Sequence, residues 1–290
     1  MSIVTFWGSG REQVGKTLSL VAIATNMAIE HNKKILIVSA SYNNDALKKC
    51  YWSEKANKNK LIIGEPGQIS LYSGIEGLSK IIQSNKITPE LIADYTKTVF
   101  KNRLEVLLGF EDEEARYQGS RNHEGETSSN SNINIAKSYV DIVRLANQYY
   151  DTVFVDLDNE IEASGREAIL EMSDVVVAMA SQKISSIETM NKQKKFLVGE
   201  KGILLVGKYD KKSKYTIKNL TRHLGEKKEV LAIPYNTLLF EASEEGQVPD
   251  LFLKLRNIKD QSDENEFFMQ QIRKVSEEIT KKITEVRLMK

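Results

Sequence analysis

The sequence predicts an α/β protein with a doubly wound, mostly parallel sheet flanked by helices. Short apolar runs alternate with helix-length segments, which is typical of strand–helix–strand units. Several runs are continuous Val, Ile and Leu, as expected for strands that are buried on both faces. The chain has 290 residues, 41% hydrophobic and 28% charged, enough for one large core. No repeat or linker interrupts it, so we expect a single domain over residues 1–290.

Each element is expected from its local pattern. Seven apolar runs are candidate strands: residues 3–7, 35–39, 104–108, 152–157, 175–180, 203–206 and 230–233. Five segments between them have helical length and periodicity: residues 17–30, 135–148, 161–172, 184–198 and 214–224.

Two segments interrupt this alternation. Residues 75–101 are expected to form a helical insertion, in which Thr88 and Pro89 are typical of a helix start. Residues 111–132 are polar, with six acidic and two basic side chains. They are expected to form a surface loop; the alternative is a segment that orders when it binds a partner.

A C-terminal amphipathic helix is expected at about residues 265–289. Its apolar stripe consists of Phe268, Ile272, Val275, Ile279, Ile283 and Val286. Packing on the sheet is the favoured role of this stripe. A coiled contact with a partner and binding to a membrane surface are the alternatives, and membrane contact is the less favoured.

Composition excludes several classes of protein. With 41 basic and 40 acidic residues the net charge is +1, which argues against bulk electrostatic binding of nucleic acid but leaves room for a local basic patch. One cysteine excludes an intrachain disulfide, and three scattered histidines lack metal-ligand spacing. No apolar run approaches the roughly 20 residues of a membrane span, and no signal peptide is expected. The expected compartment is the cytoplasm.

The most informative motif is GREQVGKT at residues 10–17, which fits G-x-x-x-x-G-K-[ST]. It follows a predicted strand and opens a predicted helix, which is the context that this phosphate loop requires. Gly10 and Gly15 let the backbone curl around a phosphate, and the helix N-terminus adds positive potential. Lys16 is expected to reach the β- and γ-phosphates, and the Thr17 hydroxyl to bind Mg²⁺.

A second acidic position would complete the metal site. The strand at 152–157 contains Asp156 near its end, the Walker B pattern, and this carboxylate is expected to hold Mg²⁺ or its water. Asp158 lies two residues further on, on the same side of an extended chain. Two roles are open for Asp158: it helps to position water, or it is an ordinary solvated acid.

These motifs resemble the MinD/ParA-type P-loop ATPases with a deviant phosphate loop. That family carries K-G-G-x-G-K-[ST], whose first lysine reaches the nucleotide of a partner subunit. The matching cation here is Arg11, while Glu12 and Gln13 replace the two middle glycines. The resemblance continues in SDVVVAMA (173–180), in LLVGKYDKKSKY (204–215), which is similar to TadZ-like pilus-assembly and conjugative-element relatives, and in AIPYN (232–236).

The resemblance implies a P-loop NTPase of the SIMIBI class that binds ATP and Mg²⁺. Thr17 and Asp156 are then the metal ligands, and Lys16 and Asp156 the catalytic residues, with Asp45 and Asp158 as weaker candidates. The implied nucleotide-binding residues are Gly10, Arg11, Glu12, Gln13, Val14, Gly15, Lys16, Thr17, Leu18, Lys208, Pro234 and Tyr235.

Three departures from the family pattern indicate weak or absent hydrolysis. Ser39, Ala40 and Ser41 replace the family's D-x-D, whose second aspartate helps to position water. Gly207 replaces the base-reading asparagine, and residues 157–160 lack the family's glycine. The run from Gly207 to Asp210 also approaches the N-K-x-D guanine motif, but we interpret Asp210 as the cap of a helix that begins near Lys214.

The expected function is an ATP-binding switch that dimerises with nucleotide and positions or recruits a pilus, secretion or conjugation machine. The alternatives are a ParA-like DNA-partition ATPase and a non-hydrolysing scaffold that keeps its nucleotide. The implied partners are a second copy of the chain with ATP and a protein of such a machine or of a partition system; DNA is a less favoured partner. Recruitment to the inner face of the membrane or to a cell pole is compatible with this function.

Overall fold

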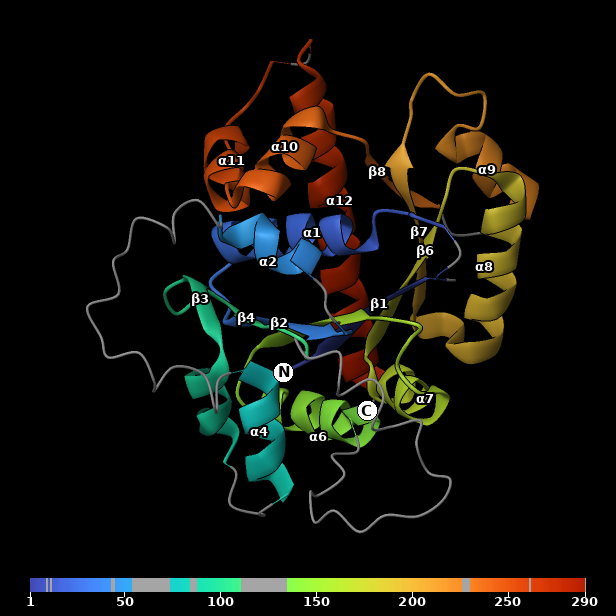
Figure 1. The fold of residues 1–290 in the computed structure, drawn as a ribbon. Coiled ribbons are helices and arrows are strands. Elements are labelled where there is room, and N and C mark those ends of the chain that lie inside the picture. Colours follow the sequence, from blue (N-terminus) through green and yellow to red (C-terminus); the bar gives the residue numbers. More distant parts are fainter. Residues whose placement is uncertain are drawn as a thin grey trace.

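A computed structural model describes residues 1–8, 10, 12–42, 45–53, 74–83, 88–110, 135–225, 230–260 and 262–289 (Figure 1). Its centre is an eight-stranded sheet in the order β3-β4-β2-β5-β1-β6-β7-β8. The pairings are parallel except for β3, which runs antiparallel to β4. The strands are β1 (Ile3–Gly8), β2 (Ile35–Ala40), β3 (Lys97–Phe100), β4 (Leu104–Leu107), β5 (Thr152–Leu157), β6 (Val175–Ala180), β7 (Gly202–Tyr209) and β8 (Leu231–Pro234).

Helices cover both faces of this sheet (Figure 1). One face packs against α1 (Lys16–Glu30), α2 (Asp45–Tyr51), α10 (Thr237–Glu245), α11 (Val248–Leu255) and α12 (Glu264–Met289). The other packs against α4 (Gly74–Gln83), α6 (Ile135–Ala146), α7 (Ala163–Met172), α8 (Ile184–Leu197), α9 (Ile217–Leu224) and the short 3-10 helix η1 (Pro89–Tyr95), and a second such turn, η2 (Gly199–Lys201), precedes β7. This three-layer arrangement confirms the predicted doubly wound fold.

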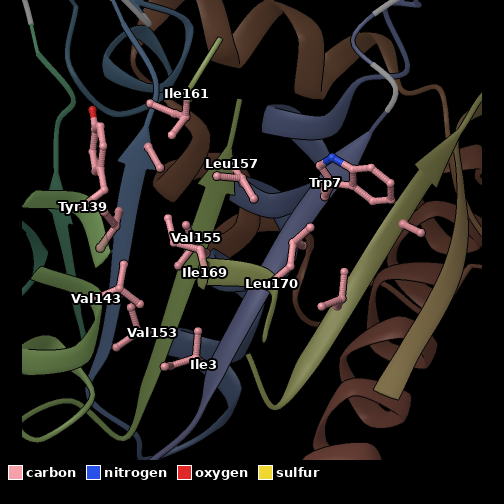
Figure 2. Packing of buried hydrophobic residues seen from close by; sticks show 14 of the residues in the cluster. Ile3, Trp7, Tyr139, Val143, Val153, Val155, Leu157, Ile161, Ile169 and Leu170 are labelled. Atoms are coloured by element: carbon pink, nitrogen blue, oxygen red, sulfur yellow. The ribbon is translucent and has the colours of Figure 1, made fainter. Parts of the chain in front are cut away.

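Alternating side chains of each central strand enter the two cores. In β1, Ile3 and Trp7 face the α6–α7 side, where they join Val155 and Leu157 of β5 (Figure 2). Phe6 belongs to the opposite core, with α1. Burial on both faces explains why the strands are continuous apolar runs in the sequence.

The seven predicted strands are confirmed, with small shifts of their ends. The predicted insertion at 75–101 is helical in α4 and η1, but its last residues form β3, an edge strand. Helices α2, α10 and α11 were not predicted; they have only seven, nine and eight residues, too few for a clear helical period. The predicted polar loop at 111–132 lies outside the described residues.

The C-terminal stripe is part of the core. Phe268, Ile272, Val275, Ile279 and Ile283 are buried in the cluster that contains α1, and only Val286 is partly exposed. The favoured prediction, packing of this helix on the sheet, is therefore confirmed for these five residues. Within the described residues no helix is long and apolar enough to span a bilayer.

The topology gathers the predicted site residues at one edge of the sheet. β1 lies between β5 and β6, with Phe6 opposite Asp156 and Gly8 opposite Met179. Since the central strands are parallel, the segments that follow β1, β2, β5, β6 and β7 meet at their carboxyl ends. Ligands of open α/β sheets bind at this edge.

Candidate functional site

The phosphate loop connects β1 to α1. Gly10 (φ 70°) and Gly15 (φ 72°) adopt the left-handed backbone conformation that the motif predicts for its glycines. Gly15 is also the N-cap of α1, and among the described residues no side chain caps this helix end. The first-turn amides of α1 are therefore oriented toward the loop, as in an anion site.

Lys16 and Thr17 both contact Asp156 of β5. The Lys16 ammonium lies 2.5 Å from Asp156 Oδ1 and donates to the Leu157 carbonyl at 2.7 Å. Thr17 Oγ1 donates to Asp156 Oδ2, also at 2.7 Å. The Asp156 side chain is fully buried, so these two residues supply the charge and the hydrogen bond that a buried carboxylate requires. The structure thus joins the three residues that the sequence assigned to phosphate and metal binding.

The segment after β5 touches the phosphate loop through Asn159, which sequence analysis missed. Its Nδ2 donates to the Gly8 carbonyl at 2.6 Å, and a Cβ on Gly10 would lie 2.7 Å from the same nitrogen. Arg166 of α7 holds this segment by donating to the carbonyls of Asn159 and Ile161. No local sequence pattern marks Asn159, because its partner, the Gly8 carbonyl, lies 151 residues away in the chain.

Ser39 and Ser41 stand where the family pattern has two aspartates. Ser39 is opposite Asp156 in the β2–β5 register, and its hydroxyl lies 2.7 Å from that of Ser41. Both serines are buried, and Tyr139 donates to the Ser41 carbonyl at 2.8 Å. This position therefore holds a neutral hydroxyl pair.

The two weaker acidic candidates are Asp158, in the turn after β5, and Asp45, at the start of α2. Asp158 Oδ1 accepts from the Glu160 amide, and the Asp158 amide donates to the Ala40 carbonyl, so the residue stabilises the turn after β5. Asp45 is the first residue of α2, but its side chain lies outside the described part of the structure.

The end of β7 packs directly on the phosphate loop. A Cβ on Gly207 would lie 1.9 Å from the Val14 carbonyl, so only glycine fits this contact. The aliphatic chain of Lys208 (φ 51°) lies over Gly15, with Cγ 3.3 Å from where a Cβ would be. Gly207 is therefore a packing requirement of this chain as well as a departure from the family pattern.

The expectation for Asp210 was wrong. Its Oδ1 accepts from the Lys212 amide, and α9 begins at Ile217 with Thr216 as its N-cap. Two side-chain–backbone turns occupy residues 210–215, one from Asp210 to the Lys212 amide and one from Ser213 to the Tyr215 amide, and the helix begins after them. Residues 214–216, which were expected to be helical, belong to the connection.

The remaining predicted binding residues surround the same edge. Gln13 is exposed, and Val14 is buried. Leu18 lies in α1 and is partly buried against the hydrophobic core on that face of the sheet. Pro234 is buried at the end of β8, whereas Tyr235 is 56% exposed and its amide donates to the Tyr209 carbonyl. Arg11, the predicted partner-directed cation, lies outside the described residues.

Glu12 makes contacts that the sequence did not suggest. Its carboxylate accepts from Ser181 Oγ at 2.5 Å and from Lys183 Nζ at 3.1 Å, both in the turn between β6 and α8. Hydrogen bonds from Ser181 and Ser186, together with the charge of Lys183, hold the pKa of the Glu12 carboxyl below its ordinary value. The phosphate loop therefore carries an ionised, partnered carboxylate.

Solved structures share this fold. No family model matches the chain, and no curated protein sequence is significantly similar to it. A ParA family ATPase from Chlorobium tepidum TLS has a TM-score of 0.64 and 14% identity over 95% of this chain and 98% of its own. MinD in the Aquifex aeolicus MinC:MinD complex has a TM-score of 0.60 and 15% identity over 95% of both chains. A putative plasmid partition protein from Borrelia burgdorferi, bound to AMPPNP, has a TM-score of 0.57 and 16% identity over 99% of this chain and 98% of its own.

These similarities span almost the whole of each chain, at low identity. They show that this chain has the fold of the ParA and MinD P-loop ATPases.

Proposed function

We propose that this chain belongs to the MinD/ParA-type ATPases and is a switch that binds ATP and dimerises with it. The observation that carries the proposal is the group formed by Lys16, Thr17 and Asp156 at a glycine loop and a helix N-terminus. The motif, the fold and the AMPPNP bound by the Borrelia protein support a nucleotide as the ligand.

The site residues have the chemistry that a magnesium–nucleotide complex requires. Thr17 and Asp156 offer a hydroxyl and a carboxylate oxygen, the hard donors that Mg²⁺ prefers, and these two residues would hold the ion. When bound there, Mg²⁺ would neutralise negative charge on the phosphate oxygens. Lys16 would exchange its contact with Asp156 for the β- and γ-phosphates, so its ion pair with Asp156 keeps the cation at the site until nucleotide arrives.

We propose that hydrolysis is weak or absent. The hydroxyls of Ser39 and Ser41 bond to each other beside Asp156 and carry no charge with which to orient an attacking water. The chain would then act through the states that nucleotide binding selects. Exchange of nucleotide, rather than rapid turnover, would reset it.

The protein that such a switch recruits is proposed from the TadZ-like resemblance, as a component of a pilus, secretion or conjugation machine. The MinC:MinD complex supports a protein partner for a chain of this fold. Recruitment through that partner could bring the chain to the inner face of the membrane or to a cell pole.

Light scattering with nucleotides tests the proposal. The wild-type chain of 32.9 kDa is expected to double its mass with Mg·ATP and to stay monomeric with Mg·ADP. Lys16→Ala should remain monomeric with both nucleotides. Arg11→Ala should keep its ATP affinity within a few-fold and lose dimerisation, while Arg11→Lys retains it. A wild-type mass that is the same with ATP and ADP at saturation would refute the switch.

A basic region favours one alternative, a DNA-partition ATPase. Residues 181–225 contain eleven Lys or Arg and three Asp or Glu side chains, a net charge of +8 in a chain of net charge +1. Within them α8 and α9 lie side by side, joined by a hydrogen bond between His223 Nε2 and Glu188 Oε1 at 2.7 Å (Figure 1). Lys218 and Arg222 are exposed, one helical turn apart, on α9. Such a face suits the phosphates of a duplex.

DNA binding separates the two candidates. A partition ATPase should retard duplex DNA of arbitrary sequence with ATP, with steep loss of affinity as salt rises. Lys218→Glu combined with Arg222→Glu should abolish the shift and leave ATP binding unchanged. Absence of any ATP-dependent shift at low salt would leave protein recruitment as the function.

A further inference from the structure

We propose that Glu12 is the anchor of the phosphate loop and that Lys183 cancels its charge, so that Lys183 tunes nucleotide affinity without contacting nucleotide. This inference rests on the proposed nucleotide site. We call the four residues Glu12, Lys183, Ser181 and Ser186 the loop clasp.

The loop clasp joins the two segments that follow the neighbouring strands β1 and β6. β1 and β6 are adjacent and parallel, so the loop after β1 lies beside the turn after β6. The Glu12 side chain extends from the phosphate loop to the turn after β6. Its Oε2 accepts from Ser181 and its Oε1 from Lys183. The Ser186 hydroxyl, which accepts from the Ser181 amide at 3.1 Å, also bonds to this carboxylate.

The clasp is fixed in turn to the β7–α9 connection. Gln182 Nε2 donates to the carbonyls of Asp210 and Tyr215, and its Oε1 accepts from the Asp210 amide. Just before this connection, at the end of β7, Gly207 and Lys208 pack on Val14 and Gly15. The phosphate loop is thus held at Glu12 by the turn after β6 and at Val14 and Gly15 by the end of β7, and Gln182 joins the turn after β6 to the connection that follows β7. This arrangement preorganises the loop without nucleotide.

The clasp also has an electrostatic consequence. A carboxylate between the two glycines of a phosphate loop repels the polyphosphate that the loop would bind. Lys183 places a positive charge 3.1 Å from that carboxylate, so the pair presents little net charge. Removing Lys183 exposes the nucleotide to the charge of Glu12. Removing both residues restores a neutral loop.

This reasoning predicts a coupled effect. Lys183→Gln should weaken Mg·ATP binding by about fivefold, within the range of couplings between contacting residues. Glu12→Gln/Lys183→Gln should bind ATP as tightly as Glu12→Gln alone, and Lys183→Arg should match the wild type. Lys192→Gln removes the same charge from an exposed position on α8 and is the matched control. The loss in Lys183→Gln should be larger for ATP than for ADP and should shrink in high salt.

Calorimetric titration of these variants with ATP and ADP decides the matter. If Lys183→Gln costs as much affinity in the Glu12→Gln variant as in the wild type, Lys183 acts on nucleotide directly, and the proposal is overturned. A Lys183→Gln variant that binds ATP like the wild type would also overturn it.

Hydrogen exchange on the nucleotide-free protein separates this inference from the proposed function. Ser181→Ala and Glu12→Gln should speed exchange of the amides of Val14 to Lys16, and Lys192→Gln should not. If the wild type binds no ATP, the proposed function fails, but faster exchange would still establish Glu12 as the anchor. Unchanged exchange in both variants would overturn the anchor whatever the nucleotide affinity.

Discussion

The Lys16 ammonium forms an ion pair with the buried Asp156 carboxylate, at 2.5 Å between Nζ and Oδ1. The two residues that would bind phosphate and metal therefore stabilise each other. Because the Asp156 side chain is fully buried, folding depends in part on this lysine and on the hydrogen bond from Thr17 to compensate for the desolvation of the carboxylate. The site is thus part of the folding energetics of the chain.

Lys16→Ala should lower the free energy of unfolding by about 2–3 kcal/mol, because it leaves a buried carboxylate without its cation. Lys16→Ala/Asp156→Asn should recover most of that loss, since the amide carries no charge. Urea denaturation of the nucleotide-free protein measures both. Lys192→Ala, on an exposed position, is the control and should change stability by less than about 0.5 kcal/mol. A Lys16→Ala variant as stable as the wild type would contradict the dependence.

Gly207→Ala should disturb the phosphate loop. The added Cβ would lie 1.9 Å from the Val14 carbonyl, so β7 or the loop has to move. We expect a loss of about 1–3 kcal/mol in stability and weaker ATP binding. Gly8→Ala is the matched control, because its Cβ would meet Met179 at an ordinary 3.6 Å. Thermal melts and ATP titrations that rank the two substitutions equally would refute the close contact.

Wild-type turnover of ATP should lie well below the about 1–100 s⁻¹ that is typical of kinases. The reason is the neutral pair of Ser39 and Ser41, together with the use of the Asp158 carboxylate in its own turn. Phosphate release at saturating Mg·ATP measures the rate, with Lys16→Ala as the blank for contaminating activity. Turnover in the kinase range that disappears in Lys16→Ala would show that another residue orients the water.

Glu12 should give stability a specific dependence on pH. Hydrogen bonds from Ser181 and Ser186 and the charge of Lys183 lower the pKa of this carboxyl in the folded state from its ordinary 4.5. The unfolded chain therefore binds the proton more readily, so Glu12 stabilises the fold above that ordinary value and loses this contribution as pH falls through its folded pKa. The melting-temperature difference between wild type and Glu12→Gln should be constant near neutrality and shrink in acid. A difference that does not change with pH would contradict the clasp.

Much of the fold could be predicted because it depends on local patterns. The central strands are apolar runs buried on both faces, and the motif at residues 10–17 specifies its own strand, glycine turns and helix. β3 was missed because an edge strand of four residues with an exposed end has little apolar signal. The C-terminal helix was predicted because its stripe runs over many turns.

The site was predictable only where a motif fixes a role. Lys16, Thr17 and Asp156 meet as expected, whereas Asn159 and Ser181 depend on tertiary contacts between segments far apart in sequence. Asn159 donates to a carbonyl 151 residues away, and no local pattern encodes such a contact. Gly207 looked like a lost base contact, but its absent Cβ makes room for the phosphate loop.

Isothermal titration of the purified chain with Mg·ATP tests the central claim, that residues 10–17 are a nucleotide-phosphate site, most directly. We predict saturable binding by the wild type at one site per chain. The same titration of Lys16→Ala/Asp156→Asn, in which the fold should be retained, is expected to give no measurable binding. Absence of binding by the folded wild type, or undiminished affinity in the double variant, would contradict the account.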